Sequence, residues 1–231
     1  MNQNGTTLPK TGNKLSAEEL EELLGDQHVS SSDDTPLRND AFDITDEEKI
    51  RIISSHFREI MNTLGLDLND DSLKGTPRRV AKMFVKEIFS GLDPANEPRV
   101  TLFEKKYNYN EIILEKNIPV YSYCEHHFVP IIGKAHVAYI ANGKIAGLSK
   151  LNRVVNYFSR RPQVQERLTA EIADFLKAKL HTENVAVIIE AEHLCIASRG
   201  IRDAGSTTIT GSYHGRLGAE KKSELIQLLK I

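Results

Sequence analysis

The chain has 231 residues, 40% of them hydrophobic, and its 30 basic and 32 acidic residues leave a formal net charge of −2. This balance excludes a broadly basic surface of the kind that binds nucleic acid, and no polybasic tract favours a membrane surface. No apolar run approaches the roughly 20 residues of a spanning helix, and the polar N-terminus lacks the apolar core of a signal peptide. We therefore expect a cytoplasmic protein that binds neither nucleic acid nor membrane and keeps its cysteines reduced.

The first 44 residues are predicted to form a flexible N-terminal arm, followed by a folded domain at 45–231. The arm is polar and turn-prone, with a run of serine and aspartate at 30–34. Within it, Ser16 and Glu19 have the spacing of a capping box, which predicts a short helix.

The folded domain begins with a helical part. A capping box at Thr45 predicts a helix that ends at Gly65. Pro77 predicts the start of a second helix, because proline is favoured at the first helical position, and Gly91 ends it. The two helices together form an N-terminal helical part at 45–92.

The remaining core, residues 100–231, contains runs rich in β-branched and aromatic residues, which predict strands, and runs with helical periodicity. We expect strands at 111–123, 135–140, 184–197 and 207–213, and helices from Ser149, from Pro162 to about Leu180, and at 219–229. After the second of these strands, Asn142-Gly143 is typical of a hairpin turn. The expected fold class is α+β with a mainly antiparallel sheet, whose exposed edges favour association into a larger barrel.

The most informative residues are the two cysteines of the chain, each accompanied by histidine, in Cys124-Glu125-His126-His127 and in His193-Leu194-Cys195. On an extended strand His193 and Cys195 share a face, and a turn brings Cys124 and His127 together. Three Cys and His ligands with an open fourth position are typical of a catalytic zinc site. The spacing leaves open which histidines bind the metal, and a free imidazole beside it can act as a general acid or base.

Three other interpretations of the cysteines stay open from the residues alone. The two thiols could form a disulfide, although a reducing compartment disfavours it. They could be inert buried thiols. They could also belong to a closed structural zinc site with four ligands.

A cluster near a predicted helix start suits a polyanionic substrate. Ser149 opens that helix, whose free N–H groups favour anions, and Lys150 and Arg153 add positive charge there. Arg199 lies just beyond Cys195 on the long predicted strand. Taken singly, each basic residue is most simply part of a solvated face, and no glycine-rich nucleotide motif accompanies them.

Two further polar groups have a functional and a simpler interpretation. Arg78, Arg79 and Lys82 form a second basic patch on the second predicted helix, and each singly is most simply part of a solvated face. Gln165 and Glu166 combine an amide with a carboxylate, which can accept hydrogen bonds from the N–H and amino groups of a purine. From chemistry alone, the exposed face of a helix is the preferred interpretation of this pair.

Several motifs together closely resemble the GTP cyclohydrolase I family. They occur in the family's order and spacing within residues 45–231, at 76–83, 124–128, 147–151, 161–168 and 193–195. The resemblance implies a tunnelling fold (T-fold), in which antiparallel sheets with helices on one face join across subunits into a barrel. It also implies pentameric rings stacked into a homodecamer, with active sites at subunit interfaces.

In that family, GTP and water are converted to 7,8-dihydroneopterin triphosphate and formate, the first step of tetrahydrofolate and pterin biosynthesis. The resemblance therefore implies GTP as substrate and Zn²⁺ as cofactor, with the metal ligands Cys124, His127 and Cys195. The catalytic residues that it implies are His126 and His193 as the acid–base pair, together with Ser149. It implies Glu166 as the guanine anchor with Gln165 beside it, and Arg79 and Lys82 as triphosphate contacts from a neighbouring subunit. The implied ribose and triphosphate contacts are Ser149, Lys150, Arg153 and Arg199.

The chain departs from the family pattern in two places. Its first 44 residues match no family motif, and the segment 212–216, with His214, stands where the family is usually small and glycine-rich. Two alternative functions remain: a related T-fold enzyme such as a nitrile reductase or a pterin synthase, and a non-catalytic zinc-stabilised oligomer. Nitrile reductases and pterin synthases do not combine these metal ligands with a pair such as Gln165-Glu166. A zinc-stabilised oligomer would bind metal without releasing formate.

Overall fold

The computed structural model describes residues 32–231, of which residues 34–231 form one compact unit. The helix expected around Ser16 lies outside the described residues. Residues 34–44, which the sequence assigns to the arm, are part of this same compact unit. None of the described helices is long and apolar enough to cross a membrane.

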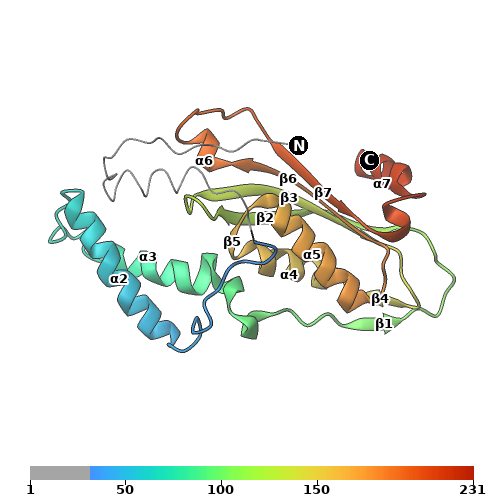
Figure 1. The fold of residues 1–231 in the computed structure, drawn as a ribbon, viewed down its shortest axis with the longest axis horizontal. Coiled ribbons are helices and arrows are strands. Elements are labelled where there is room, and N and C mark those ends of the chain that lie inside the picture. The colour runs from blue at the N-terminus through green and yellow to red at the C-terminus, as the bar shows by residue number, and fades with distance from the viewer. Residues whose placement is uncertain (1–31) are drawn as a thin grey trace, which may run out of the picture. The chain divides into compact units, whose positions relative to one another are not determined.

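A five-stranded sheet in the order β5-β2-β3-β6-β7 forms the centre of the unit (Figure 1). Its strands are β2 (Ile113–Cys124), β3 (Pro130–Tyr139), β5 (Pro162–Gln163), β6 (Val185–His193) and β7 (Thr208–Tyr213). All neighbours are antiparallel except β2 and β5, which run parallel. The predicted α+β class with a mainly antiparallel sheet is therefore confirmed.

A separate two-stranded sheet pairs β1 (Leu102–Glu104) with β4 (Lys144–Ala146). Gly143 takes the positive φ of 74° that the turn after β3 requires. The prediction of a hairpin there is wrong, however, because β4 pairs with β1 rather than with β3. A two-residue turn signal specifies where the chain reverses, and it does not specify which strand becomes the partner.

Two helices precede the sheets. The first, α2 (Asp46–Thr63), begins at the predicted cap, where the Thr45 hydroxyl accepts a hydrogen bond from the Glu48 amide at 3.3 Å. The second, α3 (Thr76–Met83), carries proline in its first turn and continues into a π-helical turn at Phe84–Ile88. Both helices therefore occur where the capping box and Pro77 predict them.

The main core lies between one face of the large sheet and the helices α4 (Leu148–Ser159) and α5 (Gln165–Leu180), which Figure 1 shows side by side. Leu151 and Leu176 from the helices and Val187 from β6 are fully buried there. Alternate residues of β6, such as Ile188, face the other way and pack with Leu225. Leu225 belongs to α7 (Lys222–Leu229), so the expectation that all helices cover one face holds for α4 and α5 but not for α7.

The start of α5 differs from the prediction, which placed it at Pro162. Pro162 and Gln163 instead extend beside the end of β2, where Cys124 is the register partner of Gln163. The Glu125 amide donates to the Gln163 carbonyl at 3.1 Å. The fixed φ of proline suits an extended segment as well as a first helical turn. Here the pairing of Pro162 and Gln163 with β2 favours the extended conformation. As a result, the N-terminus of α5 begins beside Cys124.

Candidate active site

Three potential metal ligands meet at one end of the large sheet. Cys124 ends β2, His127 lies in the turn that follows, and Cys195 lies on the short helix α6 (Leu194–Ala197). One ligand atom from each lies within 4.8 Å of the others, and the Cys124 Sγ and His127 Nδ1 atoms are 3.8 Å apart. In the turn, the Phe128 amide donates to the Cys124 carbonyl at 2.8 Å. Cys124, His127 and Cys195, the metal group, can therefore hold a metal ion.

The prediction that Cys195 lies on a strand is wrong. It placed His193, Cys195 and Arg199 on one long strand, whereas β6 ends at His193 and the chain turns into α6 at Leu194. The pairing of β6 with β3 also stops at His193, opposite Ile131, so no partner strand extends the ladder further. The helical turn, not strand alternation, brings Cys195 to Cys124.

The chemistry of the donors fits a borderline-soft divalent cation. Both cysteines are free thiols. Burial raises the pKa of the Cys195 thiol, and the nearby Cys124 raises it further. Two adjacent sulfurs in such a place become thiolates only when a cation compensates their charge, and two thiolates with one imidazole favour zinc.

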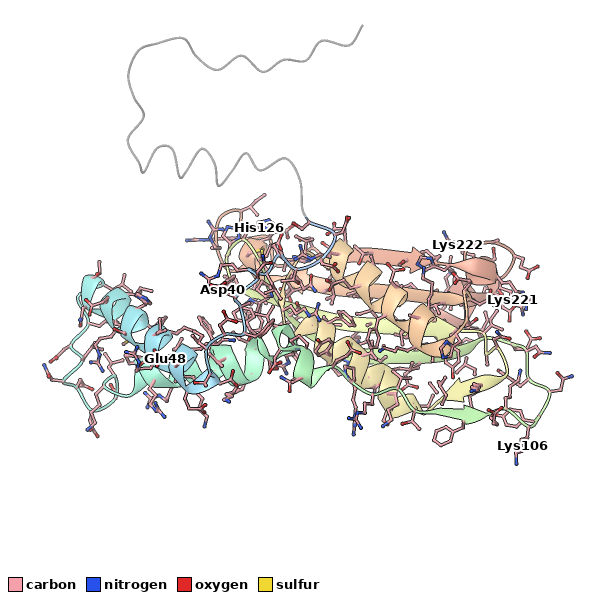
Figure 2. The ribbon with its side chains drawn as sticks, turned by 60° about the horizontal axis from the view of Figure 1, so that its bottom comes forward. Asp40, Glu48, Lys106, His126, Lys221 and Lys222 are labelled. Carbon is pink, nitrogen blue, oxygen red and sulfur yellow. The ribbon has the colours of Figure 1, made fainter. Side chains whose placement is uncertain are left out.

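Two further histidines lie next to this group. The exposed His126, labelled in Figure 2, has its Nδ1 atom 3.6 Å from Cys124 Sγ and its Nε2 atom 3.7 Å from Glu125 Oε1. The Nε2 atom of the partly buried His193 is 2.8 Å from Gln165 Oε1. Burial lowers the pKa of His193, while the negative charge of Glu166 acts in the opposite direction.

A partly buried ion pair between Arg167 and Glu125 fixes the loop that carries His126, and sequence reasoning missed it. Arg167 Nη2 donates to Glu125 Oε2 and, at 3.1 Å, to the Pro162 carbonyl, while Arg167 Nε donates to Gln163 Oε1 at 3.0 Å. Glu125 thus joins α5 to the turn beside His126. The signal was present in the sequence, since a glutamate between metal-ligand candidates needs a cationic partner when it is even partly shielded from water.

The structure also brings Gln165, Glu166 and Arg199 to this end of the sheet. Gln165 and Glu166 form the first turn of α5, with Gln165 buried and Glu166 exposed. Arg199 is exposed and lies close enough to act on the Cys195 thiol, whose pKa it lowers against the larger effect of burial.

The predicted anion cluster on α4 does not lie beside the metal group within one chain. Helix α4 begins near the small sheet, where the Gly147 amide donates to the Thr101 carbonyl at 3.5 Å, and it ends just before β5. Its 12 residues make it about 18 Å long, so Ser149 and Lys150 are at the end away from Cys124. In Figure 2, the labelled His126 lies far from the labelled Lys106, which follows β1.

Lys150 and Arg153 instead line a basic cleft along α4. Its volume is about 530 Å³, and Arg99 and Arg160 contribute further positive charge to its lining. The cleft therefore has the charge that a polyphosphate requires, although one chain alone does not place it at the metal group.

Arg79 and Lys82 are exposed on α3, as the sequence predicted. Arg79 Nη2 donates to Thr76 Oγ1 at 2.9 Å and to the Ser72 carbonyl at 3.0 Å. Within the described residues, neither side chain has a contact with the three potential metal ligands.

Comparison with known proteins identifies the family. The family model described as GTP cyclohydrolase I matches residues 53–230. A protein named GTP cyclohydrolase 1 from Flavobacterium johnsoniae is 54% identical over 218 residues, which cover 94% of this chain and 98% of the relative. A protein of the same name from Enterobacter sp. (strain 638) is 51% identical over 193 residues, covering 84% of this chain and 87% of the relative.

Among solved structures, the apo form of the archaeosine synthase QueF-Like aligns with a TM-score of 0.40 at 16% identity, covering 47% of this chain and 97% of that one. The family model and the relatives agree over nearly the whole folded unit, so the chain belongs to the GTP cyclohydrolase I family.

Proposed function

We propose that this protein is a zinc-dependent GTP cyclohydrolase I. It hydrolytically opens the imidazole ring of the guanine of GTP and yields 7,8-dihydroneopterin triphosphate and formate, the first step of tetrahydrofolate and pterin biosynthesis. The observation that carries this proposal is the meeting of Cys124, His127 and Cys195 beside His126 and His193, in a chain that belongs to this family.

In this proposal Cys124, His127 and Cys195 hold one Zn²⁺ ion. A set of three protein ligands would suit a catalytic zinc ion, since structural zinc sites use four. A bound zinc ion supplies the Lewis acidity that makes water a nucleophile near neutral pH. The exposure of His127 leaves this side of the group accessible to a substrate.

The two remaining histidines move protons. His193 protonates N7 of the guanine, which makes C8 electrophilic enough for water to attack, and a second hydrolysis releases formate. His126 assists the opening of the ribose that precedes rearrangement and ring closure. The pair of Glu125 and Arg167 keeps the His126 loop in place.

The substrate contacts divide between residues near the metal group and residues away from it. Glu166 accepts hydrogen bonds from the N–H and amino group of guanine, and adenine would leave this acceptor unpaired. Arg199 is close enough to the same site to contact a phosphate. Ser149, Lys150 and Arg153 on α4, and Arg79 and Lys82 on α3, then reach the ribose and triphosphate from neighbouring subunits, because α4 begins far from Cys124 in its own chain.

The proposed assembly is a T-fold homodecamer of two stacked pentamers, in which the sheets join across subunits into a barrel. Among the described strands β7 pairs only with β6, so its outer edge is available for another strand. Ile209 on this strand is 67% exposed, which favours its burial by a neighbour. We place the enzyme in the cytoplasm, with residues 45–231 as its catalytic domain and residues 1–44 as an arm.

One assay tests the function. Purified protein with GTP and zinc should release formate and develop pterin absorbance, while ATP should give neither. Metal without formate release would instead support the non-catalytic zinc oligomer.

Two sets of variants test the roles of the site residues. His126→Ala and His193→Ala should keep the zinc content of the wild type and lose most turnover, about 100-fold or more, whereas Cys195→Ser should lose zinc. Full activity in both histidine variants would contradict the acid–base roles, and normal zinc content in Cys195→Ser would contradict the ligand set.

A further inference from the structure

The side chain of Gln165 forms its hydrogen bonds within the protein. It is only 1% exposed. Its Nε2 group donates to the Ile189 carbonyl at 3.1 Å, to the Thr208 carbonyl at 2.9 Å and to Thr210 Oγ1 at 3.1 Å. No donor hydrogen of this amide is left for a purine.

These acceptors fix which end of the amide points to His193. Exchanging the oxygen and nitrogen would place Gln165 Oε1 against two backbone carbonyl oxygens, which are acceptors only. Gln165 Oε1 must therefore be the atom that faces His193 Nε2, at 2.8 Å. Because an amide oxygen only accepts, His193 Nε2 carries the hydrogen of this bond.

A chain of directed hydrogen bonds holds the amide in this orientation. Thr169 Oγ1 donates to the Gln165 carbonyl at 2.7 Å and lies 2.6 Å from Thr210 Oγ1. The single hydroxyl hydrogen of Thr169 is then used, so Thr210 donates to Thr169 and accepts from Gln165. Residues from α5, β6 and β7 thus permit only one orientation of the Gln165 side-chain amide.

We propose that Gln165 is a positioning residue for His193 and not a contact for guanine. It holds neutral His193 as the Nε2–H tautomer, so Nδ1 is the nitrogen that takes up a proton to form the imidazolium and then gives this proton to the substrate. Within the described residues, Nδ1 of His193 has no hydrogen-bond partner. The inference rests on the proposed function, and it divides the Gln165-Glu166 pair: the exposed Glu166 binds guanine, and the buried Gln165 orients the acid.

Gln165→Met tests the proposal, because methionine has a similar length and no acceptor oxygen. With zinc-loaded protein and GTP, kcat should fall about 10- to 100-fold, part of the roughly 10²–10⁴-fold that a general acid contributes, while KM changes less than about threefold. Thr210→Val removes one of the three acceptors and should lower kcat less than Gln165→Met does. Gln227→Met makes the same substitution at an exposed site on α7 and serves as the matched control.

A double-mutant cycle separates positioning from a structural effect. If Gln165 acts only through His193, then adding Gln165→Met to His193→Ala should cause no further loss of kcat. Additive losses would overturn the proposal. So would a tenfold rise in KM at unchanged kcat, or altered discrimination between GTP and inosine triphosphate, since both indicate contact with the base.

A measurement on the wild type does not depend on whether the variants fold. In solid-state ¹⁵N NMR of zinc-loaded, histidine-labelled protein, the signals that His193→Ala removes should be those of an Nε2–H tautomer. An Nδ1–H tautomer would overturn the inference. If the wild type releases no formate from GTP, the proposed function itself fails; if it does while Gln165→Met keeps full kcat, only the role of Gln165 fails.

Discussion

At the scale of single residues, burial disfavours the negative charge of Glu171 on α5. Gln163 Nε2 donates to Glu171 Oε2 at 2.7 Å, and Arg161 Nη1 lies 3.7 Å from Glu171 Oε1. Burial nevertheless raises the pKa of Glu171, and these two neighbours only reduce that effect. The protonated form is thus favoured more in the folded chain than in the unfolded chain.

This raised pKa predicts the sign of a pH effect. Between the unfolded pKa of about 4.3 and the higher folded pKa, the folded state holds more protons, so the stability due to Glu171 decreases as pH rises. Glu171→Gln removes this dependence. In thermal unfolding, the Tm of the variant should therefore rise relative to that of the wild type, by a few degrees, as pH increases from about 4 to 7; a constant difference or the opposite trend would contradict the prediction.

At the scale of elements, Gly91 is where the helical part is attached to the core. Its amide donates to the Arg160 carbonyl at 2.9 Å, and its carbonyl accepts from Arg161 Nε at 2.8 Å. The Arg161 guanidinium lies 4.6 Å from the centre of the Phe158 ring. A Cβ atom at residue 91 would overlap the carbonyl oxygens of Tyr157 and Arg160.

We therefore expect Gly91→Ala to destabilise the protein by about 1–3 kcal/mol, the usual cost of overpacking. The measurement is urea unfolding. The matched control is Gly205→Ala, where a Cβ would meet only Asp203 Oδ1 at an ordinary 3.6 Å. Equal stability of the two variants would show that the attachment at Gly91 adapts without cost.

Elements differ in how far the sequence predicts them. The helix α2 and the strand β7 were predicted because a cap and a β-branched run are local signals. The two-residue strand β5 and the four-residue helix α6 were not, because elements this short depend on neighbours distant in the chain. In the site, spacing predicted that the cysteines and nearby histidines form a metal site. The pairing of Arg167 with Glu125 and the orientation of Gln165 could not be predicted, because they depend on contacts between elements.

At the scale of the whole molecule, one chain does not assemble every residue that the proposed reaction needs. The start of α4 and the metal group lie about one helix length, roughly 18 Å, apart. Helix α2 also leaves part of its predicted apolar face uncovered, with Ile60 51% and Leu64 71% exposed. Both observations favour an assembly in which subunits share sites and bury these side chains.

Shared sites predict complementation between inactive subunits. Cys195→Ser and Lys150→Ala each disable a different part of the site. After the two variants are dissociated and reassembled in equal amounts, about a quarter of the sites between neighbours should receive both intact parts, given random mixing. The measurement is formate release from GTP. No recovery, with reassembly verified by light scattering, would show that each chain supplies its own Lys150.

The closeness of Cys124 and Cys195 also predicts that the protein is sensitive to oxidants when no metal is bound to it. With sulfur atoms within 4.8 Å, the two thiols can give up two electrons and two protons together and form a bond between β2 and α6. That single event removes two ligands at once, and a thiol reductant reverses it. An ion bound there would shield the sulfurs from oxidation, so oxidants should inactivate metal-free protein reversibly and leave metal-loaded protein active.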